Sequence, residues 1–322
     1  MSGEVTGLDM NEVLEKLYLG SEMAVDAEEL RKLGVTHILT VCHRPLPTEQ
    51  HAGFKYLYVS ANDVEDADLL TRLSDCFRFI EEGRQQGGVL VHCVAGLSRS
   101  ATVVIAYVMM KTEHRSLDEA LDFVSSKRHS IKPNFGFLEQ LHLFEAMGSE
   151  VNPQHPHYVN YRIQMLALKV QRGAKVNEIL GDLHEDPLQQ SRSGQQKASS
   201  FFKCRKCRRP LFRRSGILPH SQGAGDAAFD WRSQQSARGK HSLIGQEELC
   251  QRSLFIEPVE WMRNDILAME GKIICPKCCA KLGSYNWFGE RCPCGTWVTP
   301  AFHVQTAKVD ECKITALPTT PS

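Results

Sequence analysis

The sequence predicts an α/β fold in the first half of the chain and a smaller, cysteine-rich domain in the second half. In the first half, strand-like apolar runs alternate with helical patterns, which is typical of a mainly parallel sheet with helices on its faces. One of these runs, Gly88–Val91, enters a short loop from which a second apolar run leaves, and this pattern predicts a buried strand, a tight loop and a helix. Nine of the 12 cysteines, in contrast, follow residue 200.

The individual elements of the first half follow from hydrophobic periodicity and from residues that begin or end helices. The predicted strands are Lys16–Leu19, Thr36–Val41, Phe54–Val59 and Gly88–Val91. The predicted helices are Ala27–Leu33, Ala67–Glu82, Ser100–Met110, Ser116–Ser126 and Phe135–Met147. Ser116 and Glu119 have the spacing of a capping box, and Gly148 with Pro153 ends the last helix.

The domain organisation follows from changes in composition along the chain. We expect an α/β domain over residues 1–150, a helical connector and flexible linker over 151–200, and a cysteine-rich domain over 201–322. In the connector, Tyr158, Tyr161, Met165 and Leu168 recur at helical spacing, which predicts a helix that docks on one of the domains or, alternatively, binds a partner. The Gly-, Ser- and Gln-rich stretch near 221–245 predicts a mobile insertion.

The overall charge says little about binding partners, whereas hydropathy and the N-terminal sequence indicate the cellular compartment. The 38 basic and 38 acidic residues balance, so the overall charge does not predict binding to nucleic acid or membrane. No apolar run reaches membrane-spanning length, and Met1 to Gly20 lacks the basic and apolar regions of a secretory signal. We therefore expect the chain in the cytoplasm and nucleus, where thiols stay reduced and crowded cysteines indicate metal binding rather than disulfides.

The loop after Gly88–Val91 carries the strongest chemical signal. Residues 92–100 read His-Cys-Val-Ala-Gly-Leu-Ser-Arg-Ser, which places Cys93 where backbone N–H groups and a helix N-terminus converge. Such groups bind a phosphate and also lower the pKa of a thiol, so that Cys93 becomes a nucleophile. Arg99 can bind the phosphate with two parallel hydrogen bonds, and Ser100 can donate to the sulfur when it leaves. The candidate substrate-binding residues are Val94, Ala95, Gly96, Leu97, Ser98 and Arg99.

The spacing His-Cys-x-x-Gly-x-x-Arg-Ser resembles the signature of the Cys-dependent protein phosphatases. Four flanking segments resemble the dual-specificity branch, namely Leu17–Ser21, Val35–Val41, Ser60–Asp63 and Ile131–Phe137. The resemblance implies a dual-specificity phosphatase-like sheet flanked by helices and a phospho-cysteine intermediate. It also implies that Asp63 is the general acid and then the general base, with Asp66 as the next candidate. No metal is needed for this chemistry, because the loop supplies the positive field.

The composition of the loop also limits the substrate. Its interior carries no cation, whereas a loop for multiply phosphorylated inositol rings would place Lys or His there, so lipids and RNA ends are disfavoured. The first half has no tyrosine-rich segment that resembles the deep phosphotyrosine site of the classical tyrosine phosphatases. Both observations favour a shallow cleft that admits phosphotyrosine as well as phosphoserine and phosphothreonine.

The second half predicts two structural zinc sites. Two Cys-x-x-Cys pairs supply the four soft ligands that Zn²⁺ prefers, Cys204 with Cys207 and Cys275 with Cys278. A third pair, Cys292 with Cys294, needs two more ligands, and His220 and Cys250 are the best candidates. The weaker claimants are Cys279, which could enter the first site, and His241, His303 and Cys312. Every coordination position is filled by protein, so these ions would stabilise the fold and not activate water.

Two further features of the second half leave alternatives open. The seven basic residues between Lys203 and Arg214 could contact RNA phosphates or could offset the charge of the zinc thiolates. The aromatic residues expected in the core around the sites are Trp261, Trp287, Phe288 and Trp297.

Taken together with the first half, this tail resembles the atypical dual-specificity phosphatases with a C-terminal zinc-binding domain. The segments 255–261 and 287–297 carry that resemblance. It implies phosphoprotein substrates, a nuclear and cytoplasmic location, and a role of the tail in maturation of the large ribosomal subunit. The alternative function is therefore a ribosome assembly factor that acts mainly through its zinc domain, on pre-ribosomal particles or RNA, with phosphatase activity secondary.

Overall fold

The computed structural model describes residues 7–114, 116–153, 155–176, 183, 186–190, 200–218, 220, 250 and 253–312, and the chain divides into two compact units, Met1–Pro153 and Gln154–Ser322. The first boundary is close to the predicted one at 150, and the helix expected as a connector belongs to the second unit. The predicted insertion at 221–245 lies outside the described residues. None of the described helices is both long and apolar enough to cross a membrane.

The first unit is built on a five-stranded sheet in the order β1-β2-β5-β3-β4. Its strands are β1 Met10–Leu14, β2 Leu17–Gly20, β3 Val35–Cys42, β4 Lys55–Ser60 and β5 Gly88–His92. All neighbours are parallel except β1 and β2, so the predicted mainly parallel α/β sheet is confirmed. Strand β1 was not predicted, because an edge strand as short and as polar as Met-Asn-Glu-Val-Leu has no distinctive pattern.

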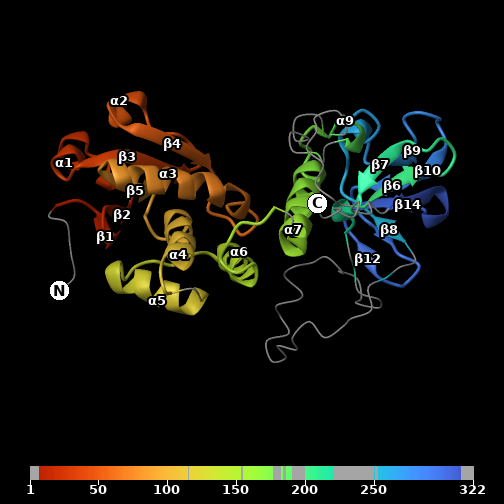
Figure 1. Cartoon of the computed structure of the whole chain (residues 1–322). Coiled ribbons are helices and arrows are strands. Elements are labelled where there is room, and N and C mark those ends of the chain that lie inside the picture. The colour runs from red at the N-terminus through yellow and green to blue at the C-terminus, as the bar shows by residue number, and fades with distance from the viewer. Residues whose placement is uncertain are drawn as a thin grey trace, which may run out of the picture. The chain divides into compact units, whose positions relative to one another are not determined.

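Six α-helices accompany this sheet in the described part of the first unit (Figure 1). They are α1 Ala27–Lys32, α2 Thr48–His51, α3 Leu73–Gln86, α4 Arg99–Lys111, α5 Leu117–Lys127 and α6 Phe135–Ala146. The predicted capping box at Ser116 and Glu119 is present at the start of α5. Helix α4 packs on the sheet and is in turn covered by α5 and α6, so that residues 99–109 are all buried. The loop that precedes α4 is therefore fixed to the most buried helix of the unit.

Helix α3 begins later than the predicted start at Ala67. Residues Leu70–Arg72 form a 3-10 turn before it, because the side-chain oxygen of Gln140 accepts the N–H groups of both Leu69 and Leu70 at 2.9 Å. This side chain comes from α6, far along the chain. It satisfies two backbone N–H groups that would lie in the first turn of the predicted helix and would have no acceptor within that helix. Tertiary contact thus overrides the local helical pattern.

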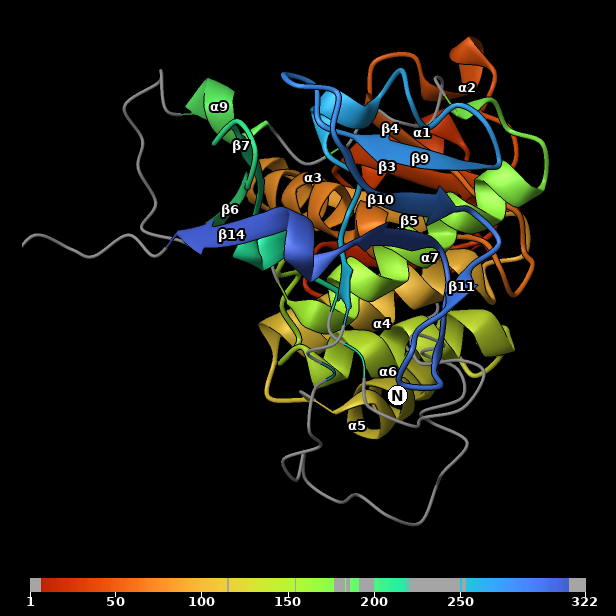
Figure 2. The same cartoon turned by 90° about the vertical axis from the view of Figure 1, so that its right-hand side faces the viewer.

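The second unit combines small antiparallel sheets with one long helix, α7 Pro156–Gln171. Figure 2 shows β9 and β10 side by side in one sheet and β6, β7 and β14 in another. The four-stranded sheet has the order β8-β13-β10-β9, with β8 Leu254–Phe255, β9 Glu270–Ile274, β10 Lys281–Asn286 and β13 Ala301–Val304. The three-stranded sheet contains β6 Phe201–Cys204, β7 Pro210–Arg213 and β14 Val309–Cys312. The remaining elements are β11 Glu290–Arg291, β12 Trp297–Val298 and α9 Pro187–Gln190.

The core of the second unit uses only part of the predicted aromatic set. Trp287 is fully buried and donates its ring N–H to the Ile266 carbonyl at 3.1 Å, and Trp261 packs partly buried against the same core. The prediction is wrong for Phe288 and Trp297, whose exposed fractions are 54% and 39%. Phe288 directly precedes the tight turn at Gly289, and Trp297 belongs to the two-residue strand β12, so both lie in short surface segments that direct side chains outward. Helix α7 supplies apolar side chains to the core instead, among them Ile163 and Val170.

Candidate active site and metal centres

The phosphate-binding loop lies between β5 and α4, at the carboxyl end of a central strand of the sheet. Cys93 directly follows β5, and α4 begins at Arg99, so the N-terminus of a 13-residue helix faces the loop. At the middle of the loop, Gly96 has a φ of 71°, and a Cβ there would lie 2.6 Å from the Gly20 carbonyl group. Only glycine fits both the left-handed backbone and this close approach.

The four carbonyl groups from Val94 to Leu97 accept hydrogen bonds from segments outside the loop. Val94 O accepts from the Glu22 N–H at 3.1 Å, and Leu97 O accepts from the Lys132 N–H at 2.7 Å. Between them, Ala95 O and Gly96 O accept from the guanidinium of Arg128 at 3.3 and 3.1 Å. In a trans peptide the N–H points away from the carbonyl, so the N–H groups of the same peptides are directed to the opposite side of the loop.

The sulfur of Cys93 lies among these donors. It accepts from the Gly96 N–H and from the Ser100 hydroxyl, each at 3.2 Å. Burial raises the pKa of the Cys93 thiol, but these hydrogen bonds and the positive charge of Arg99 outweigh burial, and the net pKa is lowered. Cys93 is only 1% exposed, yet hydrogen-bond donors and a cation surround its sulfur, which is what a thiolate requires.

Two other buried cysteines of the first unit provide the contrast. Cys42 ends β3, and burial raises the pKa of its thiol to about 11. Cys76 lies within α3, and burial raises its pKa to about 12. Both have the properties of inert core thiols, whereas the donors around Cys93 shift its pKa in the opposite direction.

The two remaining predicted catalytic residues face one another beside the loop. The Arg99 side chain is buried, donates from Nη1 to the Ala61 carbonyl at 3.3 Å and lies with Nε 3.5 Å from Asp63 Oδ2. Asp63 Oδ1 accepts from the Ser98 hydroxyl at 2.7 Å and from the Asn134 amide at 2.9 Å. Asp68 instead accepts from the N–H and hydroxyl of Thr71 at the following turn. Asp63 is thus placed within reach of a leaving group bound in the loop.

His92 is the last residue of β5 and directly precedes Cys93. Burial lowers the pKa of its imidazole to about 4, so the ring is neutral near pH 7. Its Nε2 is 2.7 Å from the Thr40 hydroxyl, and its Nδ1 is 3.4 Å from the Cys93 carbonyl. The ring therefore links the end of β3 to the residue that carries the nucleophile.

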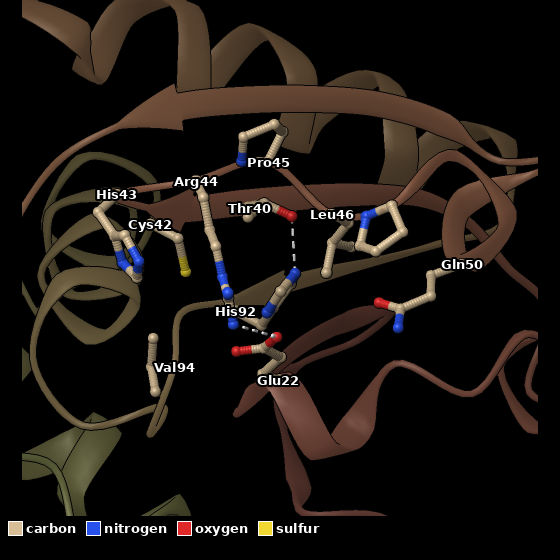
Figure 3. Close-up of a pocket in the computed structure, with 11 residues that line it drawn as sticks. Glu22, Thr40, Cys42, His43, Arg44, Pro45, Leu46, Gln50, His92 and Val94 are labelled. Atoms are coloured by element: carbon tan, nitrogen blue, oxygen red, sulfur yellow. Dashed lines mark hydrogen bonds and ion pairs between the residues drawn. The ribbon is translucent and has the colours of Figure 1, made fainter.

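His92 also lines a pocket of about 270 Å³ beside the loop (Figure 3). Its remaining lining comes mainly from the end of β3 and the segment after it: Glu22, Thr40, Cys42, His43, Arg44, Pro45, Leu46, Pro47, Gln50 and Val94. Two pairs of polar groups in this lining face one another, Thr40 with His92 at 2.7 Å and Arg44 with Glu22 at 3.9 Å. Val94, which directly follows the nucleophile in the sequence, lines the pocket and is 43% exposed.

Sequence reasoning missed Arg128 and the backbone contacts of Glu22 and Lys132. Arg128 is buried, although it follows Lys127 at the end of α5, where the sequence resembles a solvent-exposed helix terminus. Nothing in the sequence around Arg128 indicates its hydrogen-bond partners, which lie far away in the sequence. The Arg128 guanidinium also donates to Asn11 at 3.0 Å and to Asp9 at 2.9 Å, both at the N-terminal edge of the unit.

The second unit brings together the eight predicted metal ligands in two clusters. The first contains Cys204, Cys207, Cys275 and Cys278, and the second contains His220, Cys250, Cys292 and Cys294. Within each cluster the ligand atoms lie within 4.8 Å of one another. The sulfur pairs Cys204–Cys278, Cys207–Cys275 and Cys250–Cys292 are 3.7, 3.6 and 3.7 Å apart. Sulfurs at about 2.3 Å from a tetrahedral Zn²⁺ are about 3.8 Å apart, so both clusters fit zinc.

The weaker claimants that the structure describes are placed elsewhere. Cys279 is exposed, His303 lies 3.4 Å from Glu290, and Cys312 belongs to β14. His241 lies outside the described residues. The first cluster therefore consists of four cysteines and the second of one histidine and three cysteines, with ligands drawn from both ends of the second unit.

Several cations of the basic stretch beside the first cluster pair with carboxylates of the second unit. Asp310 of β14 accepts from Arg205 at 3.0 Å and also from Arg208. Arg214 pairs with Glu311, and Arg209 pairs with Asp186, both at 2.6 Å. Four of the seven cations are thus paired, with three carboxylates, so the charge of the stretch is neutralised only in part. Contact with RNA phosphates and offset of the zinc thiolates both stay predictions.

The fold and the loop define a Cys-dependent phosphatase of the dual-specificity class. Residues 17–147 match the family "Dual specificity phosphatase, catalytic domain", which confirms that the first unit is an enzyme domain of this class. The match begins with β2 and ends just after α6, so it includes the whole parallel sheet and the phosphate-binding loop.

Comparison over the whole chain identifies a narrower group. The chain is 42% identical to dual specificity protein phosphatase 12 of Mus musculus over 308 residues, which covers 94% of this chain and 88% of the relative. It is 40% identical to the Homo sapiens protein of the same name, with coverage of 95% and 89%. It is 30% identical to tyrosine-protein phosphatase YVH1 of Saccharomyces cerevisiae, with coverage of 99% and 97%. The chain belongs to the dual specificity protein phosphatase 12 family.

Proposed function

We propose that this chain hydrolyses phosphotyrosine, phosphoserine and phosphothreonine in proteins through a phospho-cysteine on Cys93. The observation that carries the proposal is the sulfur of Cys93, which accepts two hydrogen bonds in a loop whose four carbonyls from Val94 to Leu97 accept from segments outside it. The same loop N–H groups that stabilise the thiolate stabilise the negative oxygens of a phosphoryl group.

The reaction has two steps. The Cys93 thiolate attacks phosphorus, and Asp63 protonates the oxygen of the departing alcohol or phenol. A water then attacks the phospho-cysteine, Asp63 takes its proton, and inorganic phosphate leaves with the Cys93 sulfur as the leaving group. Ser100, which donates to that sulfur at 3.2 Å, stabilises the thiolate as it departs. Arg99 turns from the Ala61 carbonyl to the phosphoryl oxygens when substrate is bound.

The pocket beside the loop receives the side chain next to the phosphorylated residue. Val94, which directly follows Cys93, lines the pocket, and the Cα atoms of consecutive peptide residues are about 3.8 Å apart, so the side chain next to the phosphoresidue reaches the pocket. Because Thr40 and His92 bond one another, and Arg44 faces Glu22, these polar groups need no partner from the ligand. The rest of the lining contains His43 and Gln50 beside Cys42, Pro45, Leu46, Pro47 and Val94, and its apolar members favour a large apolar side chain.

The catalytic proposal is tested by trapping the intermediate. Wild-type protein mixed briefly with a ³²P-labelled phosphotyrosine peptide and quenched in acid should carry label on the peptide that contains Cys93. Cys93→Ser should abolish turnover and labelling while it keeps most of the affinity for inorganic phosphate. Turnover by Cys93→Ser, or label on another residue, contradicts the proposed nucleophile.

The pocket is tested with the same peptide carrying Leu, Asp or Ala next to the phosphoresidue. We expect kcat/KM to be highest with Leu, and Leu46→Trp, which fills the pocket, should remove that preference. Hydrolysis of p-nitrophenyl phosphate, which has no neighbouring residue, should stay unchanged in Leu46→Trp. Equal kcat/KM for the three peptides in the wild type would refute this assignment.

A second candidate function, assembly of the large ribosomal subunit in the nucleus and cytoplasm, rests on the zinc-binding unit. Its support is the pair of exposed aromatic residues, Phe288 and Trp297, on a unit with two clusters that fit zinc. In cells that express only the Cys93→Ser chain, normal ribosome maturation would make this role primary. Failure of maturation with Cys93→Ser would make catalysis the primary role.

A further inference from the structure

The residue that holds the phosphate-binding loop from behind is Arg128, which lies outside the signature. We propose that Arg128 is a positioning residue for catalysis: its guanidinium sets the orientation of two loop peptides and thereby directs their N–H groups toward the phosphoryl group. The inference rests on the phosphatase function proposed above.

The geometry of the two peptides carries the argument. The Ala95 carbonyl and the Gly96 N–H belong to one peptide group, and a trans peptide directs them to opposite sides. The carbonyl accepts from Arg128 Nη2 at 3.3 Å, while the N–H donates to the Cys93 sulfur at 3.2 Å. A rotation of this peptide would break both bonds at once. Arg128 therefore acts on the nucleophile through a single rigid peptide plane.

The next peptide is held in the same way. Its carbonyl, Gly96 O, accepts from Arg128 Nε at 3.1 Å, so the N–H of Leu97 is directed to the opposite side, where the phosphoryl oxygens bind. Glycine at position 96 has a φ of 71° and no Cβ, so the backbone on its own resists rotation weakly at this point. The loop thus has its most flexible residue where Arg128 supplies two hydrogen bonds.

Arginine is the side chain that this position requires. One planar guanidinium donates to two carbonyls and also to Asn11 Oδ1 and Asp9 Oδ1, at 3.0 and 2.9 Å. A lysine ammonium has the charge but not the fixed fork of donors that would reach both carbonyls. Asp9 and Asn11 fix the plane of the guanidinium, and Asp9 balances its charge, since Arg128 itself is only 6% exposed.

The test uses Arg128→Met and Arg128→Lys in the full-length protein, with three readouts. We expect kcat for p-nitrophenyl phosphate to fall about 10- to 100-fold in Arg128→Met, since misplaced groups lose rate on this order. The inhibition constant of inorganic phosphate should rise, and the midpoint pH for alkylation of Cys93 should move upward. Arg128→Lys should recover only a minor part of each effect. Full recovery by lysine would show that charge alone matters and would overturn the proposal.

A matched control separates positioning from general loss of structure. Arg84 also donates to a backbone carbonyl, Glu15 O, and to a side chain, Tyr107, but contacts no residue of the loop through these bonds. Arg84→Met should lower the melting temperature and leave phosphate inhibition and the alkylation midpoint unchanged. Equal shifts in both variants, or no shift in Arg128→Met, would overturn the proposal.

Two further measures keep the outcome decisive. If Arg128→Met does not fold, Asn11→Ala removes one acceptor of the guanidinium without leaving a buried charge unpaired, and it should shift the same readouts by a smaller factor. Unchanged readouts in a folded Asn11→Ala, next to an insoluble Arg128→Met, would indicate a purely structural arginine. Phosphate binding and alkylation do not need turnover, so they test Arg128 even if the wild type were to hydrolyse no phosphoprotein.

Discussion

The two units of this protein place their cysteine sulfurs in contrasting surroundings. In the first, one contiguous loop surrounds the Cys93 sulfur with hydrogen-bond donors, on a helix buried within an apolar domain. In the second, sulfurs from distant parts of the sequence meet in two clusters, and short strands surround them. The first arrangement lowers the pKa of a thiol and leaves it reactive, whereas the second brings sulfurs together at the spacing that zinc ligands have.

The difference shows what stabilises each unit. The first unit has a continuous core that includes most of α4 and the central strands, so its loop is rigid without a metal. In the second unit, Cys275 belongs to the larger apolar core and Cys292 to the smaller one, so each of these ligands is itself part of a core. Loss of the metal ions from the two clusters would therefore weaken the packing of both apolar cores.

The largest effect should follow zinc removal. Structural zinc contributes roughly 10–16 kcal/mol to folding of small domains, which is comparable with a whole domain's net stability of about 5–15 kcal/mol. All four tryptophans follow residue 200, so tryptophan fluorescence reports on the second unit alone. With a strong chelator we expect a red shift of the emission maximum while hydrolysis of p-nitrophenyl phosphate continues. If activity and fluorescence fall together, the two units do not differ as described.

The next effect concerns the acid beside the loop. Asp63→Asn should lower kcat by about 10²- to 10⁴-fold for an alkyl phosphate, because the departing alkoxide then finds no proton donor. The loss should be smaller for p-nitrophenyl phosphate, whose leaving group needs little protonation. Asp68→Asn is the matched control, since Asp68 accepts from Thr71 at a neighbouring turn. Equal losses on both substrates would assign Asp63 a role in binding only.

Whether a part of the fold or of the site could be predicted from the sequence depends on how far apart in the sequence the contacting residues lie and on whether a local pattern marks them. The nucleophile, Arg99 and Ser100 lie within a few residues of one another, so their spacing alone predicts a shared site. The metal ligands are distant in sequence, but cysteine pairs with a fixed chemistry mark them. The fold class could also be predicted, because each strand and helix has its own hydrophobic periodicity, which is a local signal.

Contacts without a chemical or periodic marker could not be predicted. The sequence around Arg128 has the pattern of an ordinary helix end, yet its partners Asp9 and Asn11 lie at the other end of the unit. The late start of α3 depends on Gln140 in the same way. Phe288 and Trp297 show the converse. Their apolar character predicts burial, but Phe288 directly precedes a tight turn and Trp297 lies in a two-residue strand, and both are exposed.

A smaller effect compares thiols within the first unit. The pKa of Cys93 is lowered and that of Cys42 is raised to about 11, so Cys93 has the larger thiolate fraction of the two at any given pH. Iodoacetamide at pH 6.5 should therefore label Cys93 first, with Cys42 labelled only as the pH rises toward its pKa or after unfolding. Peptide mapping by mass spectrometry measures both rates in one sample. Similar rates at pH 6.5 would contradict the lowered pKa, and orthovanadate, which occupies the loop, should protect Cys93 alone.

The smallest effect concerns the paired cations of the second unit. Asp310→Asn with Glu311→Gln leaves Arg205, Arg208 and Arg214 without these carboxylates, and exposed pairs of this kind contribute only about 0–1 kcal/mol to stability. The melting temperature should therefore change little. Binding to single-stranded RNA, measured by fluorescence anisotropy, should tighten a few-fold and become more sensitive to salt, because more phosphates are then neutralised. If the wild type already shows the salt dependence of the double variant, the carboxylates do not neutralise the arginines, and the basic stretch is an open polyanion site after all.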